Sequence, residues 1–388
     1  MTILHTADWH VGVETHGTID PKTGLSTRLL DFLRSIDSIV DHAIKEKVDA
    51  FLFAGDAFKV RDPNPTHQRE FSTRIRKLAK AGIPVFLCIG NHDTPMAHGR
   101  ATSVDIYQAL EMDNVWVSRR PEIVTIPTKR GPLQILSIPW LKSEDIPTIG
   151  ETLHDLYEKL DNNIPTVTVA HADVAGAVYS SEQQVSITSQ NHVFPLSLLI
   201  HEKVDYIALG HIHRHQVLSH APPVVYAGSI ERIDFGEEEE EKGFVVVGIN
   251  RAPAKKKRRV SWMFHPTPSR PFLTLRHTID ATDQHPTKTI STMIEKASIG
   301  GKIMRIILTI PHDATAPIDF AAIRKICEGA TLTGISRILE QQTRSRLSST
   351  ESPTSLSTMD ALNAYLMAKN IKGVRARELV AAAEKLIL

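Results

Sequence analysis

The chain has 388 residues, more than the roughly 100 to 200 residues of one ordinary domain, so we expect two or three separately packed regions. Hydrophobic residues at 41% and charged residues at 23% are globular values, and no apolar run approaches the roughly 20 residues that span a bilayer. The N-terminal segment lacks the basic leader and apolar core of a secretion signal, which predicts a cytoplasmic protein with no membrane contact. A formal net charge of +1 means that any contact with nucleic acid would use a local patch.

The first 130 residues alternate short apolar runs with longer stretches of helical periodicity. Apolar residues recur at helical spacing between Leu29 and Ala43, and buried strands are predicted at "AFLFAGD" (50–56) and "IPVFLCIGNHD" (83–93). From residue 131 to about 264 shorter strand-like runs dominate, which predicts a second sheet stacked on the first. The expected fold is therefore an α/β (α+β) sandwich of two sheets flanked by helices, occupying residues 1–265.

Beyond residue 271 the pattern changes, and a small α/β domain is expected over residues 271–342. Residues 343–357 are rich in Ser and Thr, which predicts a flexible linker. Two short amphipathic helices are predicted within residues 358–388. Because isolated helices under about 12 to 15 residues are marginal in water, these would fold onto their own domain or onto a partner chain, and the residues leave both outcomes open.

Two charge runs lie between the later strands. The five glutamates from Glu237 to Glu241 and the basic run from Lys255 to Arg259 are each more typical of solvated turns than of binding sites. A phosphate-contacting role for the basic run is the less favoured interpretation.

Polar side chains with the character of metal ligands follow five of the predicted strands. They are Asp8 and His10 in "ADWH", Asp56 in "AGDAF", Asn91 and His92 in "GNHD", His171 in "VAHADV", and His211 and His213 in "GHIH". Loops beyond the carboxyl ends of strands converge in open α/β sheets, so we expect these side chains to meet. A single His at a strand end is more often a hydrogen-bonded loop residue, and only the whole set points to a metal.

Local geometry gives two further expectations for this set. Glycine precedes Asp56, Asn91 and His211, where it permits a sharp turn back over the strand end. Asp8 and His10 share the same strand parity, with Trp9 between them pointing the other way, so both would reach one ion.

The residue types indicate the chemistry. Carboxylate, imidazole and amide oxygen suit Mn²⁺, Fe²⁺ or Zn²⁺, whereas the two cysteines, Cys88 and Cys327, lie in apolar segments and are expected to be buried thiols. Two such ions, about 3.5–4 Å apart, stabilise charge on a phosphodiester and acidify a water. The reaction class expected is phosphoester hydrolysis.

The ordered pattern D-x-H, G-D, G-N-H, H, G-H-x-H resembles that of the calcineurin-like metallophosphoesterases. In addition, "GSIERIDFGEEEEEKGF" (228–244) is similar to the segment that follows G-H-x-H in the SbcD subfamily of bacterial DNA double-strand-break nucleases. The resemblance covers residues 2 to about 264 by motif, and the remainder by layout and length.

This resemblance implies a division of the ligands between two divalent ions, with Mn²⁺ the first candidate ahead of Fe²⁺, Zn²⁺ or Mg²⁺. One ion would be held by Asp8, His10, Asp56 and His213, and the other by Asp56, Asn91, His171 and His211. His92 would face the phosphate or protonate the leaving 3′-oxygen, with Asp93 as its orienter. Relatives often carry a second His where this chain has Lys59, so an acid–base role at that position is in doubt.

The resemblance further implies a nuclease acting 3′ to 5′ on duplex ends and as an endonuclease on hairpins and single strands. Its partners would be DNA and an SbcC-type SMC-like ATPase, within a nucleoid-associated heterotetramer. The homodimer would form through helices at about 66–81 and 101–112, residues 271–342 would cap the DNA, and the tail would dock on the ATPase. Two rivals remain: a small-substrate phosphatase or phosphodiesterase on the same metal core, and a catalytically weak scaffold for DNA ends.

Overall fold

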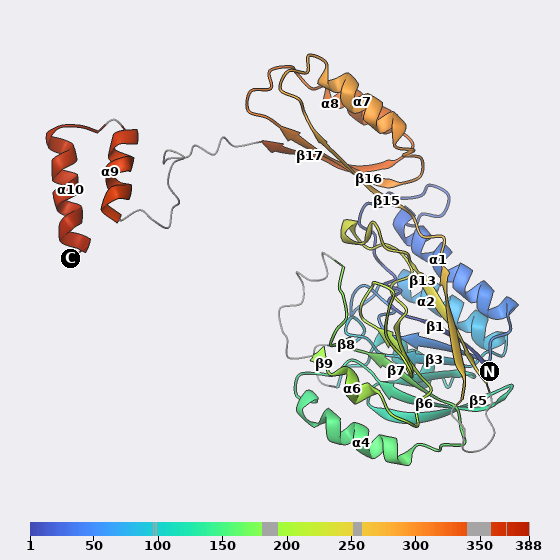
Figure 1. Ribbon diagram of the computed structural model, residues 1–388. Helices are drawn as coiled ribbons and strands as arrows, with labels where there is room; N and C mark the ends of the chain where they lie inside the picture. The colour runs from blue at the N-terminus through green and yellow to red at the C-terminus, as the bar shows by residue number, and fades with distance from the viewer. Residues whose placement is uncertain are drawn as a thin grey trace. The chain divides into compact units, whose positions relative to one another are not determined.

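The computed structural model describes residues 1–95, 97, 99–180, 193–250, 258–339, 358–369 and 371–387 (Figure 1). The chain forms two compact units. The first comprises residues 1–275, 291–306 and 320–335, and the second comprises residues 276–290, 307–319 and 336–388. The domain boundaries expected from the sequence stay a prediction. Within the described ranges, no helix combines the length and the apolar character needed to cross a membrane.

One sheet of the first unit has six strands in the order β14-β13-β1-β2-β3-β4. Strands β1 to β4 run parallel, and β13 pairs antiparallel with both β1 and β14. The strands are β1 (Thr2–Thr6), β2 (Ala50–Ala54), β3 (Val85–Cys88), β4 (Val115–Ser118), β13 (Gly243–Ile249) and β14 (Val260–Pro266). All five residues of β2 are buried, which is why this strand is a continuous apolar run instead of an alternating one.

The second sheet also has six strands, in the order β11-β12-β10-β7-β6-β5. Strands β6, β7, β10 and β12 run parallel, and the edge strands β5 and β11 are antiparallel to their neighbours. The strands are β5 (Glu122–Thr128), β6 (Gly131–Ile138), β7 (Thr166–His171), β10 (Tyr206–Gly210), β11 (Gln216–His220) and β12 (Pro223–Tyr226).

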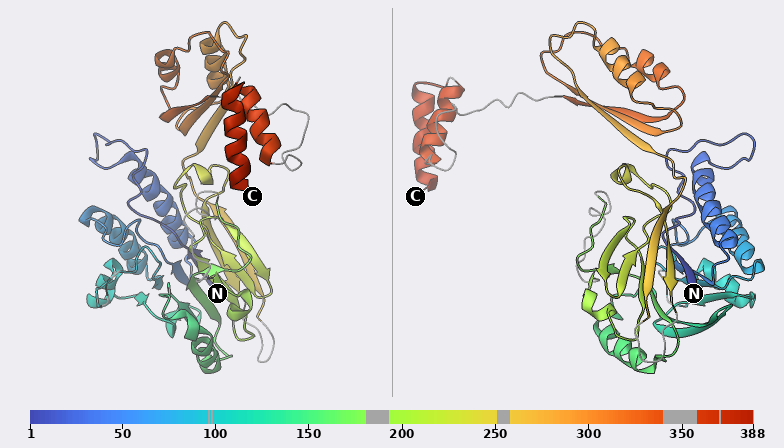
Figure 2. Two further views of the ribbon diagram at one scale, coloured as in Figure 1. Left: turned by 90° about the vertical axis from the view of Figure 1, so that its left-hand side faces the viewer. Right: turned by 45° about the vertical axis from the view of Figure 1, so that its right-hand side comes forward.

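The side chains of each strand alternate between two cores, and this alternation builds a four-layer sandwich. Phe51 and Phe53 of β2 pack beneath the helices α1 (Thr27–Lys45) and α2 (Pro65–Lys80), whereas Leu52 faces the second sheet. The outer face of the second sheet packs against α4 (Ile149–Lys159). Figures 1 and 2 show α1 and α2 on one side of the paired sheets and α4 on the other. The predicted sandwich of two sheets flanked by helices is confirmed.

The remaining elements are short connectors and the C-terminal part of the chain. The connectors are η1 (Ser103–Asp105), α3 (Ile106–Ala109), η2 (Ile146–Thr148), β8 (Asp173–Val174), β9 (Val193–Phe194), α6 (Leu196–Leu199) and η4 (Phe235–Glu237). A three-stranded sheet joins β15 (Phe272–Thr278), β16 (Ile303–Ile310) and β17 (Thr331–Leu339), accompanied by α7 (Pro286–Lys296) and α8 (Phe320–Ile326). The helical tail consists of α9 (Thr358–Ala368) and α10 (Val374–Ile387), and the predicted linker at 343–357 lies outside the described residues. Cys88 and Cys327 are buried, as expected.

The core between the two sheets generates a stability prediction. Leu52 is fully buried there, so Leu52→Ala should lower the free energy of unfolding by about 2–5 kcal/mol through lost burial and a cavity. Met263→Ala serves as the matched control because Met263 is exposed on the edge strand β14, and its effect should stay within about 0.5 kcal/mol. Urea unfolding followed by circular dichroism measures both, and equal midpoints would contradict the assigned core.

Candidate metal centre

The predicted ligand residues come together at the carboxyl ends of parallel strands. Asp8 and His10 follow β1, Asp56 follows β2, Asn91 and His92 follow β3, His171 ends β7, and His211 and His213 follow β10. Three overlapping groups, each with ligand atoms within 4.8 Å of one another, are formed by Asp8 with His10 and His213, by His10 with Asp56 and His92, and by Asp8 with Asp56 and His171. Loops from both sheets therefore meet at a single place.

The backbone of the first loop explains how Asp8 and His10 reach the same place. Their φ angles are 52° and 43°, in the left-handed region, so they have already left the strand that ends at Thr6. Main-chain bonds tie them to the neighbouring loop, from Asp8 N to Gly55 O at 3.0 Å and from His10 N to Asp56 O at 3.1 Å. The side chains of Asp8 and His10 do lie together, with 3.9 Å between Oδ1 and Nε2, but strand parity is not the reason, because neither residue has strand backbone. That both reach one ion stays a prediction. Trp9 points into the core beneath α2, as predicted.

Two of the glycines allow side chains to approach the main chain. A Cβ on Gly90 would lie 2.1 Å from Asp56 Oδ1, and a Cβ on Gly55 would lie 2.2 Å from His171 Nδ1. Gly55 also has a φ of 96°, which suits the turn that places Asp56 over the strand end. The glycine at each position therefore leaves space for a ligand side chain.

Atoms of His213, Asp8 and Asp56 surround His10 Nε2. This nitrogen lies 3.0 Å from His213 Nε2, 3.9 Å from Asp8 Oδ1 and 3.6 Å from Asp56 Oδ2. Burial, together with the nearby imidazole of His213, holds the pKa of His10 well below its usual range, so the ring is neutral. The neutral nitrogen of His10, which faces His213 and two carboxylates, is suited to hold a cation.

Asn91, His171 and His211 form a second set of predicted ligands on the other side of Asp56. Asn91 Oδ1 lies 2.9 Å from His171 Nε2 and 3.1 Å from His211 Nδ1, and His171 Nε2 lies 3.5 Å from Asp56 Oδ1. Burial lowers the pKa of His171, which favours its neutral form as well. The two oxygens of Asp56 thus face different imidazoles, and the whole cluster is compatible with a divalent metal site.

Asp93 supports the loops that carry the ligands. Its carboxylate accepts hydrogen bonds from the main-chain nitrogens of Asp56 at 2.9 Å, Ala57 at 3.0 Å and Gly90 at 3.0 Å. Burial and the charge of Asp56 raise the pKa of Asp93 to about 7, whereas these amides favour the ionised form. N–H donors reach both oxygens, which is the arrangement that stabilises an ionised carboxylate. The predicted partner of Asp93 was His92, yet Nδ1 of His92 lies 2.7 Å from the carbonyl oxygen of Lys59.

Glu237 is a residue at the site that sequence reasoning missed. The glutamate run was expected to be a solvated turn, and for Glu237 this is wrong: it is 1% exposed, and Oε1 lies 2.7 Å from His213 Nδ1. The fully buried Lys242, which follows the run, pairs with Glu237 Oε2 at 2.8 Å. Glu239 and Glu241 are exposed as expected. Composition carries no signal that separates the buried member of such a run from the solvated ones.

The other residues considered from the sequence lie elsewhere or outside the described ranges. Most of the basic run, including Lys255, is not described, while Arg258 pairs with Asp205 at 3.0 Å and donates to the carbonyl of Asn162. Arg258 is therefore occupied within the protein.

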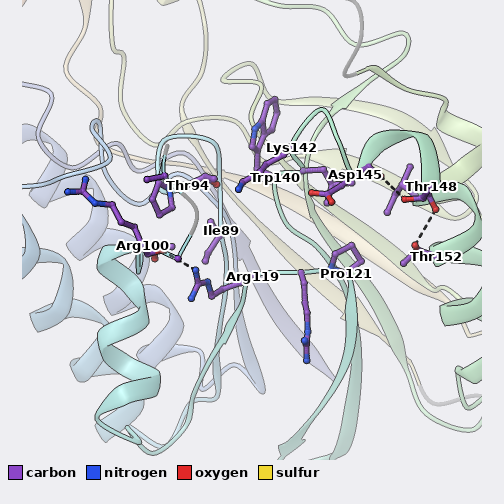
Figure 3. A pocket seen from close by; sticks show the side chains of 17 residues that line it. Ile89, Thr94, Arg100, Arg119, Pro121, Trp140, Lys142, Asp145, Thr148 and Thr152 are labelled. Carbon is purple, nitrogen blue, oxygen red and sulfur yellow. Dashed lines mark hydrogen bonds between the residues drawn. The ribbon is translucent and has the colours of Figure 1, made fainter.

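A cavity of about 380 Å³ adjoins the cluster (Figure 3). Ile89 and Thr94, which flank the G-N-H motif, form part of its wall, and so does Trp140, whose ring centroid lies 4.9 Å from that of His211. Arg119 also lines it and donates to the carbonyl of Arg100 at 3.3 Å, as Figure 3 shows. Trp140 is therefore the residue that connects the wall of this cavity with the predicted ligand His211.

The fold and the cluster define a phosphoesterase of the two-sheet class, and the comparisons agree. The model of the calcineurin-like phosphoesterases matches residues 1–215, more than half of the chain, and so the chain belongs to this family. That range contains every residue of the predicted ligand set.

Several curated proteins are similar to the chain. The SbcD component of the SbcCD nuclease of Staphylococcus epidermidis is 26% identical over 264 residues, which cover 64% of this chain and 66% of that protein. The same component from Escherichia coli K12 is 29% identical over 61% of this chain and 62% of its own length. The DNA double-strand break repair protein Mre11 of Methanosarcina mazei is 22% identical over 83% of this chain and 47% of its own length. The chain thus spans about two thirds or less of these relatives.

The role of Asp93 can be tested by replacing one of its acceptor oxygens. Asp93→Asn turns an amide group toward main-chain N–H donors, so it should lower the free energy of unfolding by about 1–3 kcal/mol and weaken Mn²⁺ binding. Asp113→Asn, at an exposed position, is the control. Thermal melts with EDTA and with Mn²⁺ measure both effects, and an Asp93→Asn protein indistinguishable from Asp113→Asn would contradict this role.

The carboxyl group of Asp8 predicts a pH dependence of metal binding. Burial, opposed by His213 and assisted by Asp56, raises the pKa of Asp8 from 3.8 to about 8 in the metal-free chain. Because the folded state holds this proton more tightly than the unfolded state, metal-free stability should fall as the pH rises from about 4 to about 8. A divalent ion that binds Asp8 would displace this proton, so the affinity for an added ion such as Mn²⁺ should rise over that window, by at most about tenfold per pH unit.

Calorimetric titration with Mn²⁺ at several values of pH measures this slope. Asp8→Asn removes the titrating group and should flatten that part of the pH dependence as well as weaken binding. A wild-type affinity that does not change between pH 6 and pH 8 would contradict the assignment.

Proposed function

We propose that this chain is a Mn²⁺-dependent DNA nuclease, the nuclease component of an SbcCD-type complex, which processes double-strand breaks and hairpins by two-metal phosphodiester hydrolysis. The observation that carries the proposal is the position of Asp56, whose two oxygens face separate groups of ligand atoms at 3.6 Å and 3.5 Å. The names of the relatives, which are an SbcCD nuclease component and the DNA double-strand break repair protein Mre11, support DNA as the substrate. Fe²⁺, Zn²⁺ and Mg²⁺ suit the same oxygen and nitrogen ligands to differing degrees and are compared in the same assay.

In this proposal the cluster divides into two ion sites that share Asp56. One site consists of Asp8, His10, Asp56 and His213, and the other of Asp56, Asn91, His171 and His211. When bound, the two ions would neutralise charge on the phosphodiester and lower the pKa of a water. The protein itself supplies neutral imidazoles and buried carboxylates, which its main chain holds in place before substrate arrives.

His92 is proposed as the group that protonates the leaving 3′-oxygen. Its Nδ1 donates to the carbonyl of Lys59, which leaves Nε2 as the atom that gains or releases a second proton. Its main-chain nitrogen donates to Asp56 Oδ1 at 2.9 Å, so the backbone of His92 is held beside the carboxylate of Asp56. As the phosphorus–oxygen bond breaks, the proton on Nε2 would pass to the departing oxygen. The positive charge of Lys59 also acts on His10, whose pKa it helps to lower.

The assembly proposed is a homodimer within a heterotetramer that contains an SbcC-type SMC-like ATPase and acts on DNA of the nucleoid. Ile106 and Leu110, which lie in the segment proposed for the homodimer, are 51% and 70% exposed, and this supports an interface there. The tail helices expose Tyr365 and Met367, which supports their docking on the ATPase. Residues 271–342 are proposed to cap the DNA.

The function is tested by degradation of an end-labelled DNA duplex in Mn²⁺, with a labelled hairpin and a single strand as further substrates. Release of 3′-terminal nucleotides is expected on the duplex, and internal cuts on the hairpin and single strand. His92→Ala should lower the rate by about 10²–10⁴-fold because proton donation is lost. His220→Ala, at an exposed histidine outside the motifs, is the matched control. Equal rates for wild type and His92→Ala would overturn the mechanism.

The same preparation separates the rival functions. A phosphatase or phosphodiesterase for small substrates would hydrolyse a simple phosphodiester such as bis-p-nitrophenyl phosphate but leave all three DNA substrates intact. A scaffold for DNA ends would bind the duplex without hydrolysing either kind of substrate.

A further inference from the structure

Glu237 lies behind the imidazole of His213, on the opposite side of the ring from His10. His213 Nδ1 lies 2.7 Å from Glu237 Oε1, while His213 Nε2 faces His10 Nε2 at 3.0 Å. We propose that Glu237 is a positioning residue that controls one of the two ion sites by fixing the ring of His213 and making its Nε2 a stronger ligand. This inference rests on the two-metal function proposed above and deepens it by assigning control of one site to a side chain outside the ligand set.

A hydrogen bond from Nδ1–H to a carboxylate has two effects on an imidazole. It selects the form of the ring in which Nε2 carries a free lone pair, and it holds the ring plane in one orientation. The negative charge also raises the electron density on Nε2, which increases its affinity for a cation. Glu237 is placed to exert both effects on His213.

A buried cation holds the carboxylate in place. Lys242 Nζ lies 2.8 Å from Glu237 Oε2 and also donates to the main-chain carbonyl of His213 at 3.2 Å. Glu237 and Lys242 are each 1% exposed, so this ion pair is shielded from solvent. The ammonium of Lys242 balances the negative charge of the Glu237 carboxylate within this buried pair. The same ion pair fixes both the ring and the backbone of His213.

The turn that carries Glu237 is itself anchored. Glu237 ends the 3₁₀ turn η4, and the ring of Phe235 in that turn packs edge-on against Phe272 with centroids 4.8 Å apart. The guanidinium of Arg305 lies 4.2 Å from the centre of the Phe235 ring. Glu238 accepts a hydrogen bond from the main-chain nitrogen of Thr274 at 2.6 Å. Strands β15 and β16 therefore hold the turn, so the carboxylate cannot readily move away from His213.

The second ion site has a different kind of support. His171, which belongs to that site, donates from Nδ1 to the carbonyl oxygen of Ala54 at 2.7 Å. A carbonyl oxygen orients the ring as well as a carboxylate does, but it adds no full negative charge. Removing the charge of Glu237 should consequently weaken the site that contains His213 and spare the site that contains His171.

The test is titration of the full-length, metal-free protein with Mn²⁺ by isothermal calorimetry. Two ions are expected for the wild type. Glu237→Gln should weaken one of the two sites by about 10–100-fold and leave the other unchanged. Glu239→Gln is the matched control, because Glu239 belongs to the same glutamate run but is exposed, and it should bind like the wild type. The gain in melting temperature on adding Mn²⁺ gives a second readout that does not depend on activity.

Glu237→Asp is a second variant that keeps the test possible if Glu237→Gln does not fold. It keeps the charge beside Lys242 but withdraws the carboxylate from His213 by one methylene, so it should show the same selective weakening. If a folded Glu237→Gln or Glu237→Asp protein binds two ions with wild-type affinity, the inference is overturned while the proposed function stands. If both sites weaken equally, the selective control is overturned. If the wild type binds fewer than two ions, the proposed function itself fails.

Discussion

The carboxylate of Asp56 contacts side chains from both sheets of this protein, and the rest of the site is arranged around it. Its Oδ2 faces His10 from the first sheet, and its Oδ1 faces His171 from the second. This geometry requires the carboxyl ends of parallel strands in both sheets to open at one edge, which the stacking of the apolar faces between the sheets achieves. The packing of the core therefore sets the spacing of the ligands.

Concentrating several carboxylates at a buried edge is unfavourable unless each has partners, and the fold supplies them in different ways. Asp93 is satisfied by main-chain amides, Asp8 receives the main-chain N–H of His211, and Glu237 is paired with Lys242. Asp93 and Glu237 therefore have their partners within the protein, whereas the carboxylates of Asp8 and Asp56 both face the imidazole of His10. The supporting acids thus differ from the predicted ligands in their partners, although all of them are buried.

Along this chain, the position of a motif at a strand end predicted the structure better than local composition did. The predicted ligands follow five apolar strands, so their convergence could be predicted from the position of each residue at a strand end. The five glutamates look alike in the sequence, but Glu237 is buried while Glu239 is exposed. What distinguishes them is the rotation of a short turn whose orientation is set by Phe235 packing on Phe272, a residue on another strand.

The sequence by itself determined the two-sheet sandwich and the set of residues that gather at its edge, because periodicity and strand-end spacing are local properties of the chain. The tertiary structure alone decided which atom each of these residues faces. It turned Asp93 to the amides of the Asp56 loop, placed the carbonyl of Lys59 at His92, and set Glu237 behind His213. These contacts join segments that are 24 to 37 residues apart, so they depend on how the strands and loops pack and not on any local pattern.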